Sequence, residues 1–349
     1  MTLKTEIYTE FDHADWDHLL MKSTESTAFQ MSKNYDPYKL AFNSKPLYIT
    51  VEDSKGNILA QLLAVQHYHN GIHSFNNSIA SKINIGSSIF WHHGPIIHDI
   101  HMHKEISTLI LQKLEHFSKL NNVLIIKGSS TLMPEQSSSV QFKNVDYHNT
   151  KWDTWVIDLK KDLDVLYKSL HNKTRYDIRK GEKNNFVFEV ATDRTILDEW
   201  IEIKHAANKR KNQILKKHEK FNNYLWEILY KPGFEKIYVA RLDGKIISGI
   251  ANKLFNKNVI QHSIINSQKN LQSGSFLTWN AMKWSKENNF LAYDMGGANP
   301  HPISVKEQGI RHYKSKWGGK EIQYDLYSKV VNKTKWRFFK LLKKSSIIR

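Results

Sequence analysis

The sequence contains no cysteine and little glycine or proline, with 15 and 7 of these residues among 349. The absence of cysteine excludes a disulfide scaffold, a thiolate nucleophile and a cysteine-ligated metal site. Long apolar runs are also missing, since no window approaches the ~18 apolar residues of a membrane span. The N-terminal stretch carries acidic residues where a signal peptide needs basic and then apolar ones. We therefore expect a soluble, cytoplasmic globular protein.

Acidic residues are fewer than basic ones. The chain has 51 Lys and Arg against 34 Asp and Glu, which gives a formal net charge of +17. Such an excess favours polyanionic partners, namely nucleic acid, anionic lipid or a phosphorylated substrate. A biased composition with Lys as a solubilising surface residue is the alternative interpretation, and it explains local clustering of bases less well.

Two stretches share one pattern. The segments that begin at Pro46 and at Phe234 each read as an apolar β-branched strand, a polar turn and a second alternating strand. Gly56 and Gly244 supply the turns, as is typical of a β-hairpin. Further along each half, an amphipathic helix is followed by a short apolar strand.

The ends of these two helices also match. Asn121–Asn122 and Asn288–Asn289 are suited to a helix C-cap. The strands that follow end at Gly128 and at Gly296. We infer an internal duplication of an α+β unit, in which a mostly antiparallel sheet is flanked by helices. The expected domains are residues 1–150 and 151–328, followed by a basic amphipathic tail at residues 329–349.

Five segments share a pattern with a known family. In chain order they are Thr27–Gln30 with Tyr35 and Lys39, Gly94–Ile96 with Asp99, Lys173–Gly181, Asp294–Gly297, and Gly309–Gly319. Together they resemble the FemABX family, whose fold is a tandem of GNAT-like acyltransferase domains. Members attach amino acids from aminoacyl-tRNA to the peptide of peptidoglycan precursors. The resemblance extends to about Tyr327 and leaves no room for the long helical arm of some members.

The resemblance implies roles for individual residues. Lys314 corresponds to a lysine that contacts phosphate, and Lys39 to one that contacts the sugar nucleotide. Arg210 corresponds to a substrate-binding arginine. His262 stands where the family has a substrate-cleft tyrosine, which is a departure from the family pattern. Asp294 is a candidate base or amine-orienting carboxylate, with strand-end packing as the alternative.

Basic residues gather in two further places. On the helix expected over Leu166–Lys183, Arg175 and Arg179 are candidate contacts to phosphate, because Arg binds anions with a fork geometry. A solvated basic face is the alternative. In the loop expected over Asn299–Gly319, Tyr313 and Lys316 flank Lys314 as candidate substrate contacts; a structural turn with ordinary aromatic packing remains open.

Ser273, Gly274 and Ser275 open a helix after a strand, so their N–H groups are candidates to bind an anion or oxyanion. A plain N-cap at Ser273 or Ser275 is the alternative. The close-spaced glycines of an acetyl-CoA pyrophosphate loop are absent. The histidines around His92–His93 and His98–His103 suggest a metal site on one side of a strand only weakly, because no His-Glu-x-x-His pattern accompanies them, and we expect no metal.

These features favour amide-bond formation between an activated acyl donor and an amine of a cell-envelope precursor. Aminoacyl-tRNA is the favoured donor, Lys314 and Asp294 are the expected catalytic residues, and no cofactor is expected beyond the co-substrate. An acyl-CoA-dependent N-acyltransferase and a non-catalytic polyanion-binding module are the alternatives. The basic tail either contacts anionic membrane, near a lipid-linked acceptor, or packs on the body.

Overall fold

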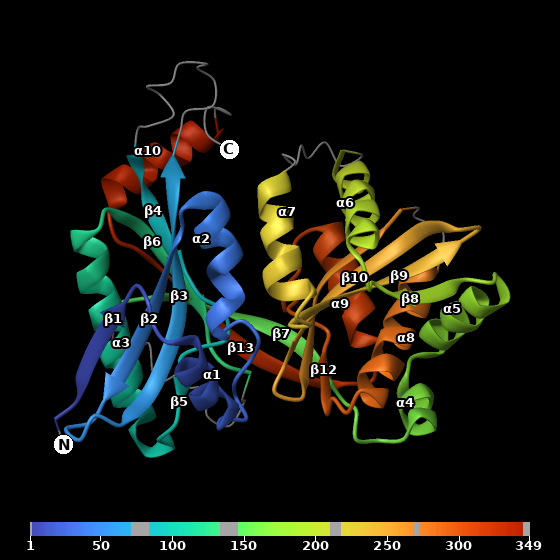
Figure 1. Ribbon diagram of the computed structural model, residues 1–349, viewed down its shortest axis with the longest axis horizontal. Coiled ribbons are helices and arrows are strands. Elements are labelled where there is room, and N and C mark those ends of the chain that lie inside the picture. Colours follow the sequence, from blue (N-terminus) through green and yellow to red (C-terminus); the bar gives the residue numbers. More distant parts are fainter. Residues whose placement is uncertain (1, 71–83, 133–145, 210–217, 268–271, 345–349) are drawn as a thin grey trace. The chain divides into compact units, whose positions relative to one another are not determined.

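The computed structural model describes residues 2–70, 84–132, 146–209, 218–267 and 272–344 (Figure 1). The chain divides into two compact units. The first comprises Met1–Lys151 and Tyr324–Arg349, and the second comprises Trp152–Gln323. Strands β7 and β13 each contain residues of both units, so the chain passes between the units along these strands.

The sheet of the first unit has the strand order β1-β2-β3-β4-β6-β13, with β5 paired to β3. Neighbouring strands are antiparallel except β4 and β6, which are parallel. Helix α3 (His103–Leu120) makes the crossover that a parallel pair requires. The strands are β1 Lys4–Tyr8, β2 Lys45–Glu52, β3 Ile58–Asn70, β4 Asn84–Phe90, β5 Ile96–Ile97, β6 Val123–Ser129 and β13 Lys320–Val330.

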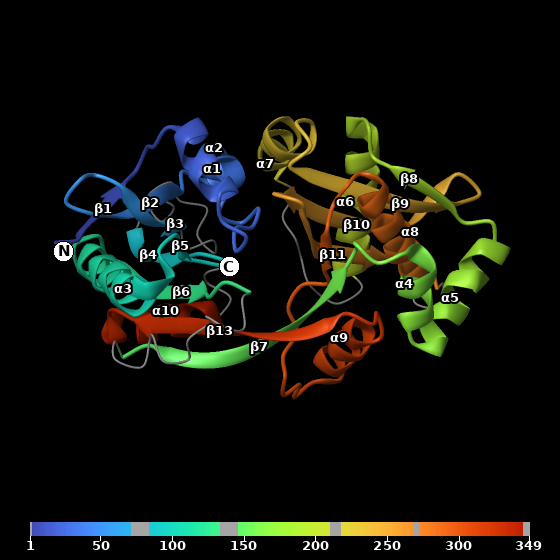
Figure 2. The ribbon, with the colours of Figure 1, turned by 90° about the horizontal axis from the view of Figure 1, so that it is seen from below.

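Helices cover both faces of this sheet (Figure 2). On one face, α3 buries Ile106 and Ile110 against Leu47 and Ile49 of β2. Tyr48, between those two strand residues, points the other way because side chains alternate along a strand. Its ring lies 5.0 Å from that of Trp16, centroid to centroid. That second face is covered by α1 (His13–Met21), the 3₁₀ turn η1 (Ser32–Tyr35) and α2 (Asp36–Phe42).

The second unit repeats this plan with the order β7-β12-β11-β10-β9-β8. Strands β11 and β12 are its parallel pair, and α8 (Ser273–Glu287) connects them. The described pairings between the other neighbours are antiparallel. The strands are β7 His148–Asp158, β8 Val187–Val190, β9 Glu235–Leu242, β10 Lys245–Phe255, β11 Asn258–Asn266 and β12 Ala292–Asp294.

In the second unit, as in the first, each face of the sheet has its own hydrophobic core. Leu166, Ile178 and Leu277 belong to a cluster on the face covered by α4 (Leu163–Ser169), α5 (Asn172–Lys183) and α8. The opposite cluster includes Trp200 and Val239. It is covered by α6 (Arg194–Lys209) and by α7 (Glu219–Leu225), which continues as the π-helical turn η5 (Trp226–Tyr230). Helix α9 (Val305–Ser315) precedes β13.

The fold predicted from the sequence is confirmed. Both hairpins form, as β2–β3 and β9–β10, and each unit then has a helix and a parallel strand in the predicted order. Asn122 and Asn289 adopt the left-handed conformation expected at the helix ends, with φ of 51° and 62°. In the part of the chain that the model describes, no helix combines the length and the apolarity needed to cross a bilayer.

The C-terminal segment differs from the expectation. Residues 324–349 group with the first unit, whereas the sequence suggested a second domain that ends at 328 and a separate tail. Leu326–Val330 of β13 pair with β6, because the free edge of β6 needs hydrogen-bond partners. Helix α10 (Lys333–Lys344) follows, and its Phe339 is only 5% exposed.

Two expected loop or strand segments are helical. Residues 305–315, expected within a loop, form α9, which starts with a capping box between Ser304 and Glu307. The histidine-rich segment expected on a strand forms the 3₁₀ turn η3 (Ile100–Met102) and the start of α3. Its histidines therefore do not share one face of a strand.

We expect Gly249→Ala to destabilise the second unit. A Cβ at Gly249 would lie 2.2 Å from Cδ1 of Trp200, so the packing of α6 on β10 must shift. Overpacking of this kind costs about 1–3 kcal/mol. Gly309→Ala in α9 is the matched control: its Cβ meets nothing within 4 Å, and Ala favours a helix by roughly 1 kcal/mol. Urea unfolding of both variants measures the difference, and equal stabilities would contradict this packing.

Candidate functional site

The parallel strands β11 and β12 separate just after Asp294. Their register ends at Ile260↔Asp294, and two residues later Gly296 takes a φ of +73°. A Cβ on Gly296 would lie 2.6 Å from the carbonyl oxygen of Gln261 and 3.3 Å from Nζ of Lys314. Only glycine allows this close approach. The end of β12, the backbone of β11 and the Lys314 ammonium therefore meet at one point.

Lys314 reaches this point from the last turn of α9. Its Nζ donates a hydrogen bond to the carbonyl oxygen of Gly297 at 2.8 Å. Burial lowers the pKa of Lys314 to about 8, and the nearby Asp294 opposes that shift. At neutral pH the side chain is thus a partly buried cation, and a pKa of about 8 places the loss of its proton in mildly alkaline solution.

Asp294 is buried, with 5% of its surface exposed. Its carboxylate accepts a hydrogen bond from the hydroxyl of Thr154 and another from the N–H of Gly296, the latter at 2.7 Å. Burial raises the pKa of Asp294, whereas these two donors and Lys314 favour its ionised form. The structure thus brings together the two residues expected to be catalytic.

Tyr313 holds α9 against the start of α8. Its hydroxyl lies 2.9 Å from Oγ1 of Thr278 and donates to the carbonyl of Gly274 at 3.3 Å. Its ring packs edge-on to Trp317, and burial raises the pKa of its phenol. Through these contacts, Tyr313 supports the start of α8.

The start of α8 has the expected sequence but a different cap. Gln272 is the N-cap residue and makes no side-chain capping bond, so neither Ser273 nor Ser275 is the N-cap. Ser273 is fully buried, and a Cβ at Gly274 would meet the amide of Asn266 at 3.2 Å. The backbone of this first turn carries the positive end of a 15-residue helix.

The two arginines of α5 that were predicted to contact phosphate make local contacts. Arg175 donates to the carbonyls of Lys168 and Leu170 at 2.7 and 2.9 Å and to the side chain of Asn172, so it closes the α4–α5 junction. Arg179 is exposed and lies 3.5 Å from the hydroxyl of Tyr167.

Lys316 follows α9, and its backbone carbonyl accepts from the N–H of His171 at 3.0 Å. Lys39 belongs to the first unit, where it is 45% exposed and pairs with Glu10 at 3.6 Å. Arg210 lies outside the described residues.

His262 belongs to a cluster of charges on the face of the sheet covered by α6. Its Nε2 lies 3.3 Å from Glu235 of β9, which also forms an ion pair with Lys253 of β10. Burial would favour the neutral acid, but Lys253 and His262 hold the pKa of Glu235 well below its usual range. Burial lowers the pKa of Lys204 on α6, and Glu235 opposes that shift.

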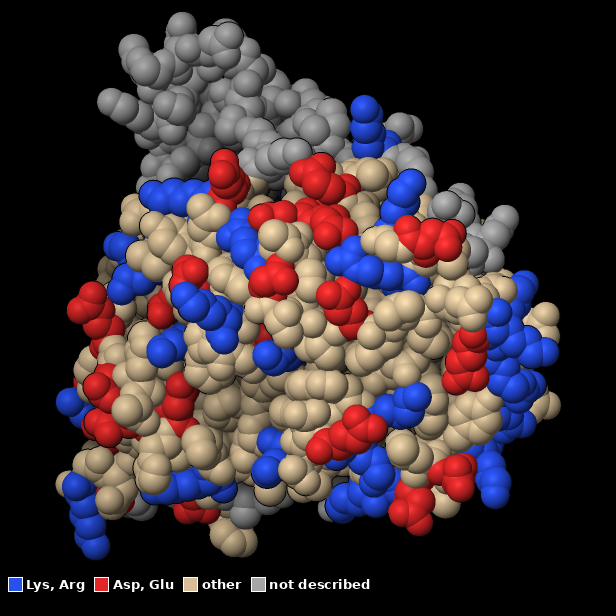
Figure 3. Space-filling view, turned by 45° about the vertical axis from the view of Figure 1, so that its right-hand side comes forward, with Lys and Arg blue, Asp and Glu red and all other residues tan. Residues whose placement is uncertain are grey.

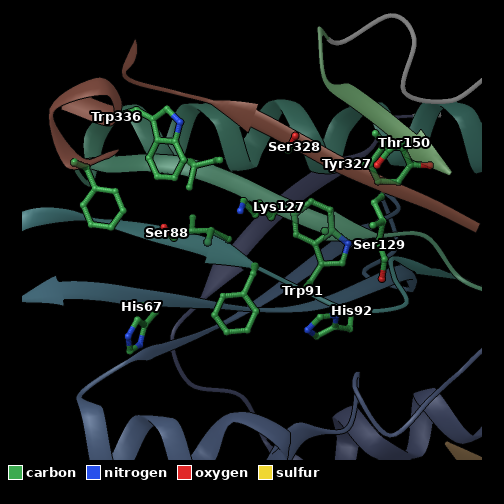
Figure 4. Close-up of a pocket in the computed structure, with 16 residues that line it drawn as sticks. His67, Ser88, Trp91, His92, Lys127, Ser129, Thr150, Tyr327, Ser328 and Trp336 are labelled. Carbon is green, nitrogen blue, oxygen red and sulfur yellow. The ribbon is translucent and has the colours of Figure 1, made fainter. Parts of the chain in front are cut away.

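The first unit contains a pocket that the sequence did not indicate (Figure 4). It has a volume of about 550 Å³ and a mostly aromatic and aliphatic lining. Lys127 of β6 lies in it, between Trp336 of α10 and Trp91, and His67 and His92 lie on its lower side in this view. The aromatic residues of the tail could have indicated this pocket. The sequence alone did not show which side of α10 faces the sheet.

Charges on the surface are mixed. Over the described residues in Figure 3, Lys and Arg side chains are interspersed with Asp and Glu, and basic side chains gather along the right-hand edge. Among the residues that the model describes, no group of three or more His, Asp or Glu residues could hold a metal ion.

Comparison with known proteins identifies the architecture. Residues 168–315 match the model of the acetyltransferase (GNAT) domain. The solved structure of FemX superposes with a TM-score of 0.70 at 14% identity, over 92% of this chain and 96% of that one. This chain has a tandem GNAT fold. No curated protein matched its sequence.

Two further solved structures share this tandem GNAT architecture. L-PGS from Bacillus licheniformis matches with a TM-score of 0.53 at 14% identity, over 86% of this chain and 90% of that one. A tandem GNAT protein from the clavulanic acid biosynthesis pathway matches with a TM-score of 0.56 at 10% identity, over 95% of this chain and 99% of that one. The region that matches the acetyltransferase model contains His262, the start of α8 and Lys314.

We expect Lys314→Met to stabilise the tandem GNAT protein. Removing a desolvated cation should raise the free energy of unfolding by on the order of 1–3 kcal/mol, since each pKa unit corresponds to 1.36 kcal/mol. Lys314 has a folded pKa of about 8 against 10.5 when unperturbed. The gain should therefore be full below pH 8 and fade as the pH rises toward 10.5.

Urea unfolding at several pH values measures this gain. Lys316→Met, two residues along, is the control and should change stability little. A loss of stability in Lys314→Met at pH 7 would show that the bond to Gly297 and the attraction to Asp294 together outweigh the cost of burial.

Proposed function

We propose that the protein transfers an aminoacyl group from aminoacyl-tRNA to an amine of a cell-envelope precursor, forming an amide bond. The observation that carries this proposal is the partly buried Lys314 ammonium at the point where β11 and β12 separate. A cation in that position, beside a gap in a GNAT sheet, suits a reaction that develops negative charge on an acyl oxygen.

Lys314 is the proposed oxyanion donor. Its Nζ has further N–H groups besides the one that bonds to Gly297. Removing a donor of this kind from an acyl-transfer site costs about 10²–10³ in rate. Because the donor ester is already activated, the reaction needs no nucleophilic side chain, and positioning supplies much of the remaining acceleration.

Asp294 has a supporting role in this proposal. Its carboxylate is held by Thr154 and by the Gly296 N–H. It sits close enough to Lys314 to oppose the fall in the lysine's pKa. It thus helps to keep Lys314 protonated, and it is also a candidate to orient the attacking amine.

The choice of donor rests on several features. The net charge of +17 and the basic helix α5 favour a polyanion, and the first turn of α8 lacks the close-spaced glycines expected for acetyl-CoA. The fold is shared with FemX, and the resemblance to FemABX proteins implies an aminoacyl donor and a peptidoglycan precursor as acceptor. The alternative is acyl-CoA, which is favoured by the match to the acetyltransferase model.

The donor is identified by supplying the purified chain with ¹⁴C-aminoacyl-tRNA or with ¹⁴C-acyl-CoA, together with a cell-envelope precursor extract. We expect label to move from tRNA to the extract, and Lys314→Met to lower kcat/KM by about 10²–10³. Lys306→Met, at an exposed position of the same helix, is the control. Label from CoA alone would overturn the choice of tRNA, and no transfer from either donor would favour a non-catalytic binding module.

The rate should also depend on pH through Lys314. Because the protonated ammonium is the proposed donor, kcat/KM should fall as the pH rises through about 8. Lys314→Arg keeps a charge at all these pH values, so its residual activity should lack this fall. A pH–rate profile of both proteins is the measurement, and an identical alkaline limb in the Arg variant would exclude Lys314 as its source.

A further inference from the structure

His262 occupies an irregular position in its strand. Between β10 and β11, Gln261 lies opposite Asn252 and Ser263 lies opposite Ala251, so His262 is the extra residue of a β-bulge. Bulges re-aim side chains and are frequent next to active sites. Here the bulge directs the imidazole to Glu235, while the neighbouring Gln261 accepts a hydrogen bond from Tyr293 at 2.9 Å.

His262 and Asp294 lie on the same face of the sheet. Val259 and Tyr293 are cross-strand neighbours and both belong to the core beneath α8. The next pair, Ile260↔Asp294, therefore faces the opposite side, where α6 packs. His262 bonds to Glu235 on that α6 side, two residues beyond Ile260.

The imidazole is both anchored and accessible. Glu235 is 4% exposed at its side chain, whereas the His262 side chain is 27% exposed. Because Lys253 and His262 keep Glu235 ionised, its carboxylate can only accept. The Nε2 of a neutral His262 must then carry the hydrogen that it donates to Glu235, which leaves Nδ1 as a proton acceptor.

We propose that His262 is the general base of the acyl transfer and that Glu235 is its positioning residue. This inference rests on the proposed function and assigns the proton-accepting group that the function requires. It also gives a role to the position where the chain departs from the FemABX pattern of a tyrosine.

The proton balance is complete with these groups. The acceptor amine attacks the carbonyl carbon of the donor ester, a C–N bond forms, and the oxyanion is held by Lys314. The positively charged nitrogen of this intermediate passes one proton to Nδ1 of His262. When the intermediate collapses, the C–O bond to the ribose breaks and the imidazolium returns that proton to the leaving oxygen. No oxidant, metal or further reactant is needed.

Several charged groups surround the imidazole. Glu235 of β9 forms an ion pair with Lys253 of β10, and Glu235 also opposes the lowering of the Lys204 pKa on α6. Asp294 of β12 is on the same face, and Lys314 of α9 is beside Asp294. The pH–rate profile should rise as His262 loses its proton and fall as Lys314 does so.

The experiment compares His262→Gln and Glu235→Gln with the wild-type protein in the labelled-transfer assay. We expect His262→Gln to lower kcat by about 10²-fold or more, the usual contribution of a general base, with a smaller change in KM. The rising limb of its pH profile should disappear. Glu235→Gln should also lower kcat, because the imidazole loses the carboxylate that fixes its orientation.

Two controls separate catalysis from folding. His301→Gln alters an exposed histidine and should leave both rate and profile unchanged. Added imidazole should restore part of the rate to His262→Ala, which would not occur if His262 acted only in packing. Because Glu235→Gln leaves Lys253 without its carboxylate, Glu235→Asp provides a second variant that keeps the charge.

The outcomes distinguish the two proposals. If the wild-type protein transfers label and His262→Gln retains its kcat and its rising limb, His262 is not the base and the proposed function stands. If the wild-type protein transfers no label from either donor, the proposed function fails and this inference fails with it. A loss of kcat in His262→Ala that added imidazole does not restore would also contradict the assignment of His262 as the general base.

Discussion

The second unit depends on one backbone constraint, the close approach of Gly296 to the carbonyl of Gln261. Parallel strands β11 and β12 are joined only briefly, and beyond Asp294 the chain turns away through a left-handed residue. Beyond this separation, Lys314 donates a hydrogen bond to the backbone carbonyl of Gly297. The chain that leaves the sheet therefore provides the acceptor for this cation.

Two charged side chains are removed from water where these strands separate. Lys314 and Asp294 lie close together in a region that disfavours the charged form of both, so their pKa values move toward each other. A second set of buried charges lies around Glu235, on the face of the sheet that Asp294 also shares. Such perturbed groups cost stability unless they are paired, and they tend to cluster at functional sites. In the described part of the second unit, these two sets of charges meet at adjoining strands, with His262 on β11 and Asp294 on β12.

The residues that the sequence suggested for the site fall into three groups according to their contacts in the structure. Lys314 and Asp294, predicted to be catalytic, lie close together because α9 and β12 both end at the separated strands. Arg175 and Tyr313 serve the fold instead, since each is bonded to the backbone of a helix end. His262 was singled out only as a departure from a family pattern. Its partner Glu235 is 27 positions away, and a pairing of that kind depends on strand register.

By itself, the sequence determined the local elements and their repetition. Apolar alternation fixed the hairpins, turn glycines fixed their ends, and asparagines fixed the ends of α3 and α8, because these depend on neighbours along the chain. The tertiary structure alone decided that residues 324–349 complete the first unit, that residues 305–315 are a helix, and that a bulge turns His262 toward Glu235. Each of these features depends on contacts between segments that are far apart in the sequence: a free strand edge, an uncovered face of a sheet or an unpaired charge. Composition and residue spacing do not encode such contacts.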